Sequence, residues 1–361
     1  MEKLFTPLQI GNVRLKNRIV FAPTSMGPSG PEAYEEIAAG GAGLIVIADL
    51  SVAPSMMGAP GLDSEEYLDG FKRIADLCHQ YGCKVSAQLF HPEYDPVYIR
   101  GLYLKARGEE GPSPDEIRKL LAENTMEYCD RLTAEEVERI IQAFAAAAER
   151  AGRAGFDMVQ IHGDRLVGSF TSPLFNHRAD LFGNHVELPR RIVRAVREKE
   201  PELPVDYKLT IRMEKEHLGR GGISETEVPE FVRELDACGV DSYHVTLANH
   251  TDVENTIPRR NHRLLPGEGC FAGLAKLVKQ YTDRPVCAVG KLQAPKTVRA
   301  VLEDGIDLVG MSRQLIADAR WPEKVEQGIT DEILYCRYCN QLCMGALRGG
   351  RPIGCILHRH S

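Results

Sequence analysis

The stretch Gly-Phe-Asp-Met-Val-Gln-Ile-His-Gly-Asp-Arg, residues 155–165, joins a short apolar run to a charged end. The apolar residues 158–161 follow a long amphipathic helical pattern and stop at a glycine, which predicts a buried strand. The charged end places His162, Asp164 and Arg165 in the loop after that strand. In a β/α barrel the loops after the strands form the mouth of the active site, so the fold of the remaining chain decides what these side chains do.

The segments on either side continue the alternation of strand and helix. Strands are predicted at residues 18–22, 44–48, 84–89, 158–161, 205–211, 242–246, 286–289 and 308–311. Helices are predicted at residues 32–39, 64–81, 133–154, 188–199, 225–237, 270–281 and 296–303, with Thr133 and Ser224 as N-caps. Residues 93–130 interrupt the rhythm and predict a loop insertion with a short helix.

This order of elements favours an α/β fold of the TIM (β/α)8 barrel type over residues 1–325, followed by a C-terminal segment at 326–361. A doubly wound sheet is the alternative. It usually carries a glycine-rich first turn, which this chain lacks.

Composition limits the possible partners. The 361 residues are 43% hydrophobic and 26% charged, with a net charge of -7 and dispersed basic residues. This pattern gives no general electrostatic footprint for nucleic acid or anionic lipid. The N-terminus has no apolar signal region, and no run reaches the roughly 18 to 20 apolar residues of a spanning helix. We therefore expect a cytoplasmic protein with no nucleic-acid or membrane partner.

Two neighbouring strand ends carry glycine and a cation. Gly290 and Lys291 follow the strand 286–289, and Ser312 and Arg313 follow the strand 308–311. Adjacent tips of this kind in a barrel form a phosphate site, because glycine lets the ligand approach backbone N–H groups. The pattern predicts a nucleotide cofactor.

Several motifs resemble the Old Yellow Enzyme family of FMN barrels from residue 4 to the C-terminus. They are Leu-Phe-Thr-Pro-Leu at 4–8, Lys-Asn-Arg-Ile-Val at 16–20, Ala-Pro-Thr-Ser at 22–25, Ala-Gln-Leu-Phe-His at 87–91, and the two phosphate tips. The resemblance implies that FMN is bound by Pro23, Thr24, Ser25, Gln88, His162, Lys208, Gly290, Lys291, Ser312 and Arg313.

Within that set, the resemblance places Ser25 at the O4 and N5 edge of the flavin and Gln88 at its pyrimidine ring. Lys208 would lie by N1 and O2, where a cation stabilises the negative charge of reduced flavin. The family commonly has Arg at this position, so a bidentate contact would be absent here. His91 is predicted to be structural.

Four cysteines near the C-terminus are spaced as Cys-x2-Cys-x3-Cys-x11-Cys, at Cys336, Cys339, Cys343 and Cys355. Spacing alone leaves a zinc site and an iron–sulfur cluster open. The local sequence Cys-Asn-Gln at 339–341 resembles the [4Fe-4S] site of the dienoyl-CoA reductase and trimethylamine dehydrogenase branch, which implies a [4Fe-4S] cluster.

Relatives in that branch continue into an FAD and NAD(P)H module, whereas this chain ends six residues after Cys355. We therefore expect a separate electron donor, either a flavodoxin-like protein or a flavin reductase, that docks near the cysteines. Free reduced flavin is the alternative donor.

The charged tip departs from the common family pattern of His-x-x-His or His-x-x-Asn followed by Gly-Tyr. The sequence His-Gly-Asp-Arg at 162–165 resembles the motif of gut bacterial bilirubin reductases, which reduce this tetrapyrrole to urobilinogen. The resemblance implies that Asp164 donates a proton and Arg165 orients the substrate. A simple ion pair between Asp164 and Arg165 is the structural alternative.

His250 resembles a substrate-site histidine of dienoyl-CoA reductases and is a second candidate proton donor, or else an ordinary loop residue. The basic residues 259–263 are interpreted as a solvated charge run. Two other functions remain open at this point. One is an enoyl-CoA, dienoyl-CoA or steroid enone reductase, and the other is a flavoprotein electron carrier without its own substrate.

Overall fold

The computed structural model describes residues 2–26, 30–54, 60–106, 111–248, 253–348 and 350–358. Within these residues, eight parallel strands form one closed barrel, because β6 pairs with both β5 and β7. In order around the barrel they are β3 (Ile19–Thr24), β4 (Leu44–Ser51), β5 (Lys84–Phe90), β6 (Met158–His162), β7 (Val205–Arg212), β9 (Ser242–Leu247), β10 (Val286–Ala288) and β11 (Leu308–Met311). The predicted TIM barrel is confirmed. The doubly wound sheet is excluded, because it is an open sheet with two edge strands.

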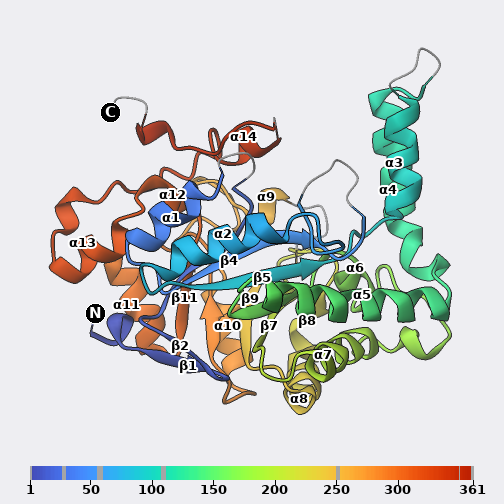
Figure 1. Cartoon of the computed structure of the whole chain (residues 1–361), viewed down its shortest axis with the longest axis horizontal. Coiled ribbons are helices and arrows are strands. Elements are labelled where there is room, and N and C mark those ends of the chain that lie inside the picture. Colours follow the sequence, from blue (N-terminus) through green and yellow to red (C-terminus); the bar gives the residue numbers. More distant parts are fainter. Residues whose placement is uncertain are drawn as a thin grey trace.

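Helices cover the outside of the barrel (Figure 1). The longer ones are α1 (Glu32–Ala39), α2 (Leu68–His79), α5 (Ala134–Arg153), α7 (Glu187–Lys199), α8 (Val228–Cys238), α10 (Ala272–Lys279) and α11 (Pro295–Glu303). Shorter helical segments follow several strand tips and the last strand: α6 (Arg165–Phe170), α9 (Val253–Thr256), α12 (Arg313–Ala317), α13 (Trp321–Gln327) and α14 (Met344–Arg348). The 3-10 turns are η1 (Glu2–Phe5), η3 (Leu181–Gly183), η4 (Glu225–Glu227), η5 (Thr330–Glu332) and η6 (Ile356–His358).

Both predicted N-caps are present. The Thr133 hydroxyl accepts the N–H of Glu136 at 3.2 Å, while the Glu136 carboxylate accepts the N–H of Thr133, so a capping box opens α5. Ser224 forms a capping box with Glu227. The turn that follows Ser224 is the 3-10 helix η4, and α8 begins only at Val228.

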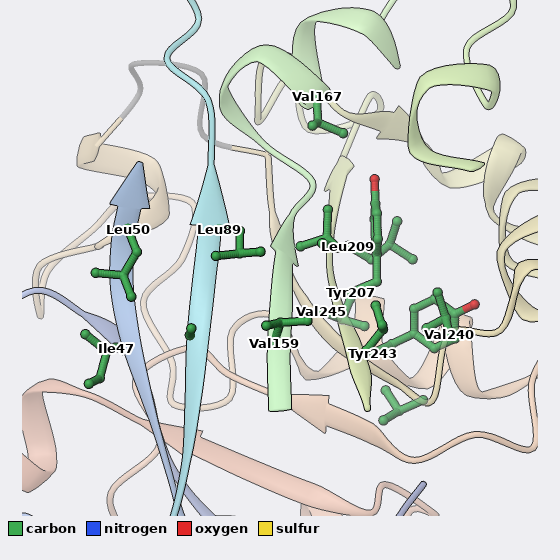
Figure 2. Close-up of a cluster of buried hydrophobic side chains, with 14 of the residues drawn as sticks. Ile47, Leu50, Leu89, Val159, Val167, Tyr207, Leu209, Val240, Tyr243 and Val245 are labelled. Atoms are coloured by element: carbon green, nitrogen blue, oxygen red, sulfur yellow. The ribbon is translucent and has the colours of Figure 1, made fainter. Parts of the chain in front are cut away.

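Alternate side chains of β7 face the outer helices and the barrel interior. Tyr207 belongs to the main hydrophobic core, and its ring lies 6.0 Å from that of Phe231 on α8. Figure 2 shows Tyr207 in this cluster with residues of β5, β6 and β9. Asp206 and Lys208, one position away on either side, face inward instead, because successive side chains of a strand point to opposite faces.

An antiparallel hairpin of β1 (Leu8–Ile10) and β2 (Val13–Leu15) covers the end of the barrel where the strands start. Its apolar side chains pack with Leu44, Met158 and Leu308, which are the first residues of β4, β6 and β11. The opposite end, where the strands finish, is therefore the end available for a ligand.

The insertion between β5 and α5 forms two helices, α3 (Pro96–Lys105) and α4 (Pro114–Arg131), which project away from the barrel in Figure 1. The prediction of a loop with one short helix was wrong here. Asp95 and Ser113 cap the two helices, and a small separate core of Ile99, Leu102 and Ile117 holds them together. A pair of helices that buries so few apolar residues gives only a weak amphipathic pattern.

The C-terminal segment is fastened to the last strands by hydrogen bonds. Gln314 donates to the carbonyl of Leu334 at 3.2 Å and accepts the N–H of Cys336 at 2.9 Å. The Tyr338 hydroxyl donates to the carbonyl of Lys291, at the tip of β10. In the part of the chain that the structure describes, none of the helices has the length and apolar character needed to cross a bilayer.

Candidate active site

A large cavity opens at the carboxyl ends of the barrel strands. All ten residues that the sequence assigns to a flavin cofactor line it, namely Pro23, Thr24, Ser25, Gln88, His162, Lys208, Gly290, Lys291, Ser312 and Arg313. They converge because the barrel brings the ends of strands distant in sequence to one face. The Thr24 hydroxyl donates to Ser312 at 2.6 Å and so joins the tips of β3 and β11.

A row of three side chains crosses the cavity floor. His162, Lys208 and His244 stand side by side in the register of β6, β7 and β9. Burial, followed by the nearby charge of Lys208, lowers the pKa of His162 well below its usual value and that of His244 to about 3. Both imidazoles are therefore neutral near pH 7. The sequence reasoning missed His244.

Lys208 brings a partly buried positive charge to this row. Burial lowers the pKa of its ammonium. Among the described residues it makes no hydrogen bond or ion pair, although it lines the cavity. A partly buried ammonium without a partner favours a ligand that supplies one, because an unpaired charge in a poorly solvated site is costly. Lys208 thus fits an anionic or carbonyl-bearing ligand in the cavity.

A second row lies one step deeper and holds Gln88 in place. In register across β5, β6, β7 and β9 stand Gln88, Gln160, Asp206 and Ser242. Gln88 donates to Gln160 at 2.5 Å, Gln160 donates to Asp206, and Ser242 donates to Asp206 at 2.6 Å. Because an ionised carboxylate only accepts hydrogen bonds, Asp206 sets the direction of the whole chain. The Gln88 carbonyl oxygen is left to accept hydrogen bonds, including a long one of 3.4 Å from the N–H of Asp49.

The tips of β10 and β11 are shaped by glycine. Gly290 has φ +111, and a Cβ there would lie 2.8 Å from the backbone nitrogen of Phe271. A Cβ on Gly310 would lie 2.7 Å from the Val289 side chain. These narrow tips let backbone N–H groups approach a ligand closely, as a phosphate site requires.

The two cations at these tips are held differently. Lys291 donates to the carbonyl of Leu265. Arg313 donates to Pro258 at 3.0 Å and to Asn340 at 2.8 Å, and its guanidinium stacks 4.9 Å from the ring centre of Tyr338. Arg313 is thus a fixed cation at this end of the cavity.

The tip of β6 carries the His-Gly-Asp-Arg sequence. A Cβ on Gly163 would lie 2.4 Å from the carbonyl oxygen of Lys208, so only glycine lets β6 and β7 approach at this point. The His162 Nδ1 accepts the N–H of Asp164 at 3.2 Å, which leaves the proton of the neutral ring on Nε2. His162 Nε2 lies 3.9 Å from Asp49.

Asp164 and Arg165 point in different directions. Asp164 is 2% exposed, and its carboxylate caps α6 by accepting the N–H of Arg165 at 3.0 Å. Arg165 lines the cavity and Asp164 does not. Arg165 has φ +56, a backbone conformation that costs a residue other than glycine about 1 to 3 kcal/mol. His250, the other predicted proton donor, lies outside the described residues.

Arg165 forms an ion pair with Glu93, a residue that the sequence reasoning missed. Its Nη1 lies 3.1 Å from the Glu93 carboxylate, and Glu93 is 5% exposed. Burial tends to lower the pKa of Arg165, but the charges of Glu93, Asp49 and Asp164 outweigh it and raise the pKa. The only possible clue in the sequence was the position of Glu93, three residues beyond β5.

Asp49 was also missed. It lines the cavity with φ +57, at a break in the register between β4 and β5. Bulges of this kind aim side chains at ligand sites, but a sequence pattern with period two does not reveal them. His91 instead has a structural place, as predicted, because its Nδ1 contacts the Pro92 carbonyl and its ring stacks on Tyr128.

The four C-terminal cysteines surround a second, small cavity. The Cys336 sulfur accepts the N–H of Tyr338 at 3.3 Å. In the described ranges, no three or more His, Cys, Asp or Glu side chains are grouped so as to hold one metal ion. A [4Fe-4S] cluster does not require such a group, because each thiolate binds its own iron atom. Four thiols around one cavity fit that donor set.

Fold and cavity together define a β/α-barrel enzyme with a site for a phosphate-bearing cofactor. The chain belongs to the NADH:flavin oxidoreductase / NADH oxidase family, which it matches over residues 3–332. The predicted resemblance is thereby confirmed, as are the oxidoreductase class and the flavin cofactor.

The chain is 42% identical to the bilirubin reductase of Clostridium symbiosum, over 98% of this chain and 97% of that protein. It is 32% identical to the bilirubin reductase of Mediterraneibacter gnavus, over 99% of this chain but only 56% of that protein. The old yellow enzyme homologue from Zymomonas mobilis shares the fold, with a TM-score of 0.67 and 19% identity over 90% of this chain and 93% of that one.

Proposed function

We propose that this chain is a flavin-dependent reductase of conjugated carbon–carbon double bonds that acts on bilirubin and takes it to urobilinogen. The observation that carries this proposal is the position of Arg165. Its guanidinium lines the same cavity as Gln88, Lys208 and the two phosphate tips. Similarity to two bilirubin reductases supports the choice of substrate.

The cavity fits FMN at both ends. Lys208, a partly buried cation without a partner among the described residues, suits the N1 and O2 edge, and the Gln88 carbonyl suits a ring N–H donor. Ser25 and Thr24 lie at the tip of β3, on the same cavity, and would contact the ring edge. Gly290, Ser312 and Arg313 would hold the phosphate. FMN bound here supplies the hydride for the reduction.

The remaining cavity residues are suited to holding a conjugated substrate. Bilirubin carries lactam carbonyls and two propionates on an apolar conjugated framework. Arg165 and the Nε2–H of His162 are hydrogen-bond donors on the cavity wall and would hold a carbonyl oxygen. A carbonyl held in this way draws electron density from the double bond, which then accepts hydride more readily.

Each reduced double bond takes up one hydride and one proton. We propose Asp164 as the source of the proton, next to Arg165 in the chain. Its carboxyl group lies behind the cavity wall as the cap of α6. Proton delivery from Asp164 therefore requires the first turn of α6 to open.

We further propose that Cys336, Cys339, Cys343 and Cys355 hold a [4Fe-4S] cluster. Electrons would come from a separate flavodoxin-like protein or flavin reductase docking near these cysteines. All four cysteine residues are partly exposed, which supports access from this side. The C. symbiosum relative is similar in extent, since the match covers 97% of its length.

Anaerobic turnover tests this function. Protein loaded with flavin is reduced with dithionite and mixed separately with bilirubin and with an enoyl-CoA, while the flavin absorbance is followed. Bilirubin is expected to reoxidise the flavin and to yield urobilinogen. Reoxidation by the thioester alone would assign the protein to the enoyl-CoA reductases, and reoxidation by neither would favour an electron carrier.

A further inference from the structure

The ion pair of Arg165 with Glu93 affects which chemical group of a ligand can bind at Arg165. Arg165 lies between the cavity, which it lines, and Glu93, which is buried and does not line the cavity. The Arg165 side chain is 28% exposed and that of Glu93 is 6% exposed. The guanidinium therefore presents one side to a ligand and the other to a fixed carboxylate.

The chain segment that carries Glu93 is fixed on both sides by hydrogen bonds. Two residues after Glu93, the N–H of Asp95 donates to the Asn124 side chain on α4 at 2.8 Å. Two residues before Glu93, the carbonyl of His91 accepts the N–H of Leu166 at 3.3 Å. The segment that carries Glu93 is thus tied both to the insertion and to α6, which begins with Arg165.

Hydrogen-bonding capacity remains on the cavity side of Arg165. A guanidinium has five N–H donors. Among the described residues, this guanidinium donates one hydrogen bond, to Glu93 at 3.1 Å. Donors are therefore left for a ligand, but the positive charge is already compensated.

The surrounding charges strengthen this compensation. Asp49 lines the cavity near His162, and Asp164 caps the helix that Arg165 begins. Asp164 is the proposed proton donor, so the two cations Arg165 and Lys208 are balanced by two carboxylates, those of Glu93 and Asp49. A ligand carboxylate at Arg165 would therefore meet a cation whose charge Glu93 already compensates, and would lie close to the Glu93 charge, whereas an uncharged carbonyl would only accept a hydrogen bond.

We infer that Glu93 is a specificity-determining residue that makes Arg165 a donor to an uncharged carbonyl and disfavours a carboxylate at the same point. The inference rests on the proposed function and refines it. Arg165 holds a lactam carbonyl of the tetrapyrrole, and the propionates lie elsewhere. The preference of Arg165 for an uncharged carbonyl applies equally to amides, ketones and thioesters.

Binding of two ligands that differ in charge tests this inference. Cinnamamide and cinnamate share a conjugated double bond and differ in their carbonyl group. Each is titrated into the oxidised, flavin-loaded protein at pH 7 while the flavin absorbance is monitored. The wild-type protein is expected to bind the amide at least about tenfold more tightly, because like charges in a partly buried site oppose binding.

The variant Glu93→Gln keeps the shape of the side chain and removes its charge. It is expected to reduce the preference for the amide by about tenfold, mainly by tightening the binding of cinnamate. Glu93→Asp, which keeps the charge, should retain the amide preference. Glu303→Gln removes the same charge from an exposed residue of α11 and is the matched control. It should leave the ratio of the amide and cinnamate affinities unchanged.

Tighter binding of cinnamate than of cinnamamide by the wild-type protein would overturn the inference, and this measurement does not depend on a variant folding. An unchanged ratio in a folded, flavin-loaded Glu93→Gln protein would also overturn it. Because the readout is binding to the oxidised protein, failure of bilirubin turnover would refute the proposed function and leave this result standing.

Discussion

At the scale of single residues, the tip of β6 depends on two unusual backbone positions. Gly163 allows β6 and β7 to approach, because any Cβ would meet the Lys208 carbonyl at 2.4 Å. Arg165 follows with φ +56 and turns its side chain into the cavity wall. Non-glycine residues with positive φ are uncommon and persist where the surrounding structure over-determines them. The contact with Glu93 and the cap by Asp164 both help to hold this geometry.

The two possible roles of Asp164 can be separated by a pair of variants. If Asp164 donates a proton, both Asp164→Asn and Asp164→Ala should lower kcat for bilirubin by about 10²-fold or more. If its carboxylate only caps α6, Asp164→Asn should stay active, because asparagine is an equally good N-cap, and Asp164→Ala alone should lose about 1 kcal/mol of stability. Steady-state rates and urea unfolding of both variants decide between these outcomes.

Arg165 has a matched test of its own. Arg165→Lys keeps the positive charge but loses the planar fork, so it should still pair with Glu93 while holding a carbonyl poorly. We expect kcat/KM for bilirubin to fall by about 10-fold to 100-fold, since each lost charge-assisted hydrogen bond is worth about 1.5 to 3 kcal/mol. The flavin content should stay the same. Unchanged kcat/KM would mean that Arg165 does not hold the substrate.

At the scale of elements, β7 supplies residues to the core, the buried row and the cavity. Tyr207 packs on α8, Asp206 anchors the row that orients Gln88, and Lys208 reaches the cavity floor. This division follows from the twofold alternation of a strand. A shift of the register by one residue would exchange the two faces and place the cavity residues in the core.

Asp206 should make the free energy of unfolding depend on pH. Burial raises its pKa to about 6, above the ordinary value of 3.8. The folded protein therefore binds the Asp206 proton more tightly than the unfolded chain does. The free energy of unfolding gains its whole contribution from this difference below about pH 4 and loses it as the pH rises to about 6. The loss amounts to about 3 kcal/mol, since one pKa unit equals about 1.4 kcal/mol.

Urea unfolding of flavin-loaded wild-type protein and of the variant Asp206→Asn, between pH 4 and pH 8, measures this effect. The advantage of the wild type should shrink between pH 4 and 6 and stay constant above pH 7. Ser242→Ala serves as a control, because it removes one hydrogen bond to Asp206 and keeps the carboxyl group. A wild-type advantage that grows with pH would show that Asp206 has a lowered pKa instead.

At the scale of the whole molecule, two cavities lie next to each other. Arg313, Ile316 and Cys343 line both the cofactor cavity and the cavity of the four cysteines. The C-terminal segment that carries the cysteines is bound to the tips of β10 and β11 through Tyr338 and Gln314. A cofactor in the first cavity and a cluster in the second would therefore be separated only by these shared side chains.

The metal content tests this arrangement. Protein purified without oxygen should show flavin absorbance with an added broad iron–sulfur shoulder, and about four iron atoms per chain by elemental analysis. Cys339→Ala should lose the iron and the shoulder but keep the flavin, because Cys339 lines only the smaller cavity. Cys238→Ala, at a distant buried cysteine, should keep both. One zinc atom per chain would refute the cluster.

The fold and the cofactor-cavity residues could both be predicted from the sequence, for related reasons. Strand and helix patterns are local, and a barrel gathers the carboxyl ends of its strands at one face. Gln88 and Lys208 lie inside predicted strands and Gly290 directly follows one, so these residues were expected to lie near one another. The insertion escaped prediction, because α3 and α4 bury only a small core of their own.

By itself, the sequence determined the barrel and the N-caps at Thr133 and Ser224, which follow from periodic and capping patterns. The family resemblance added the ten residues that line the large cavity. Only the tertiary structure decided which charges meet. It paired Arg165 with Glu93 and not with Asp164, and it aimed Asp49 at His162. Such pairs join residues of separate β/α units, and their distances depend on the positive φ of Asp49 and Arg165, which no periodicity encodes.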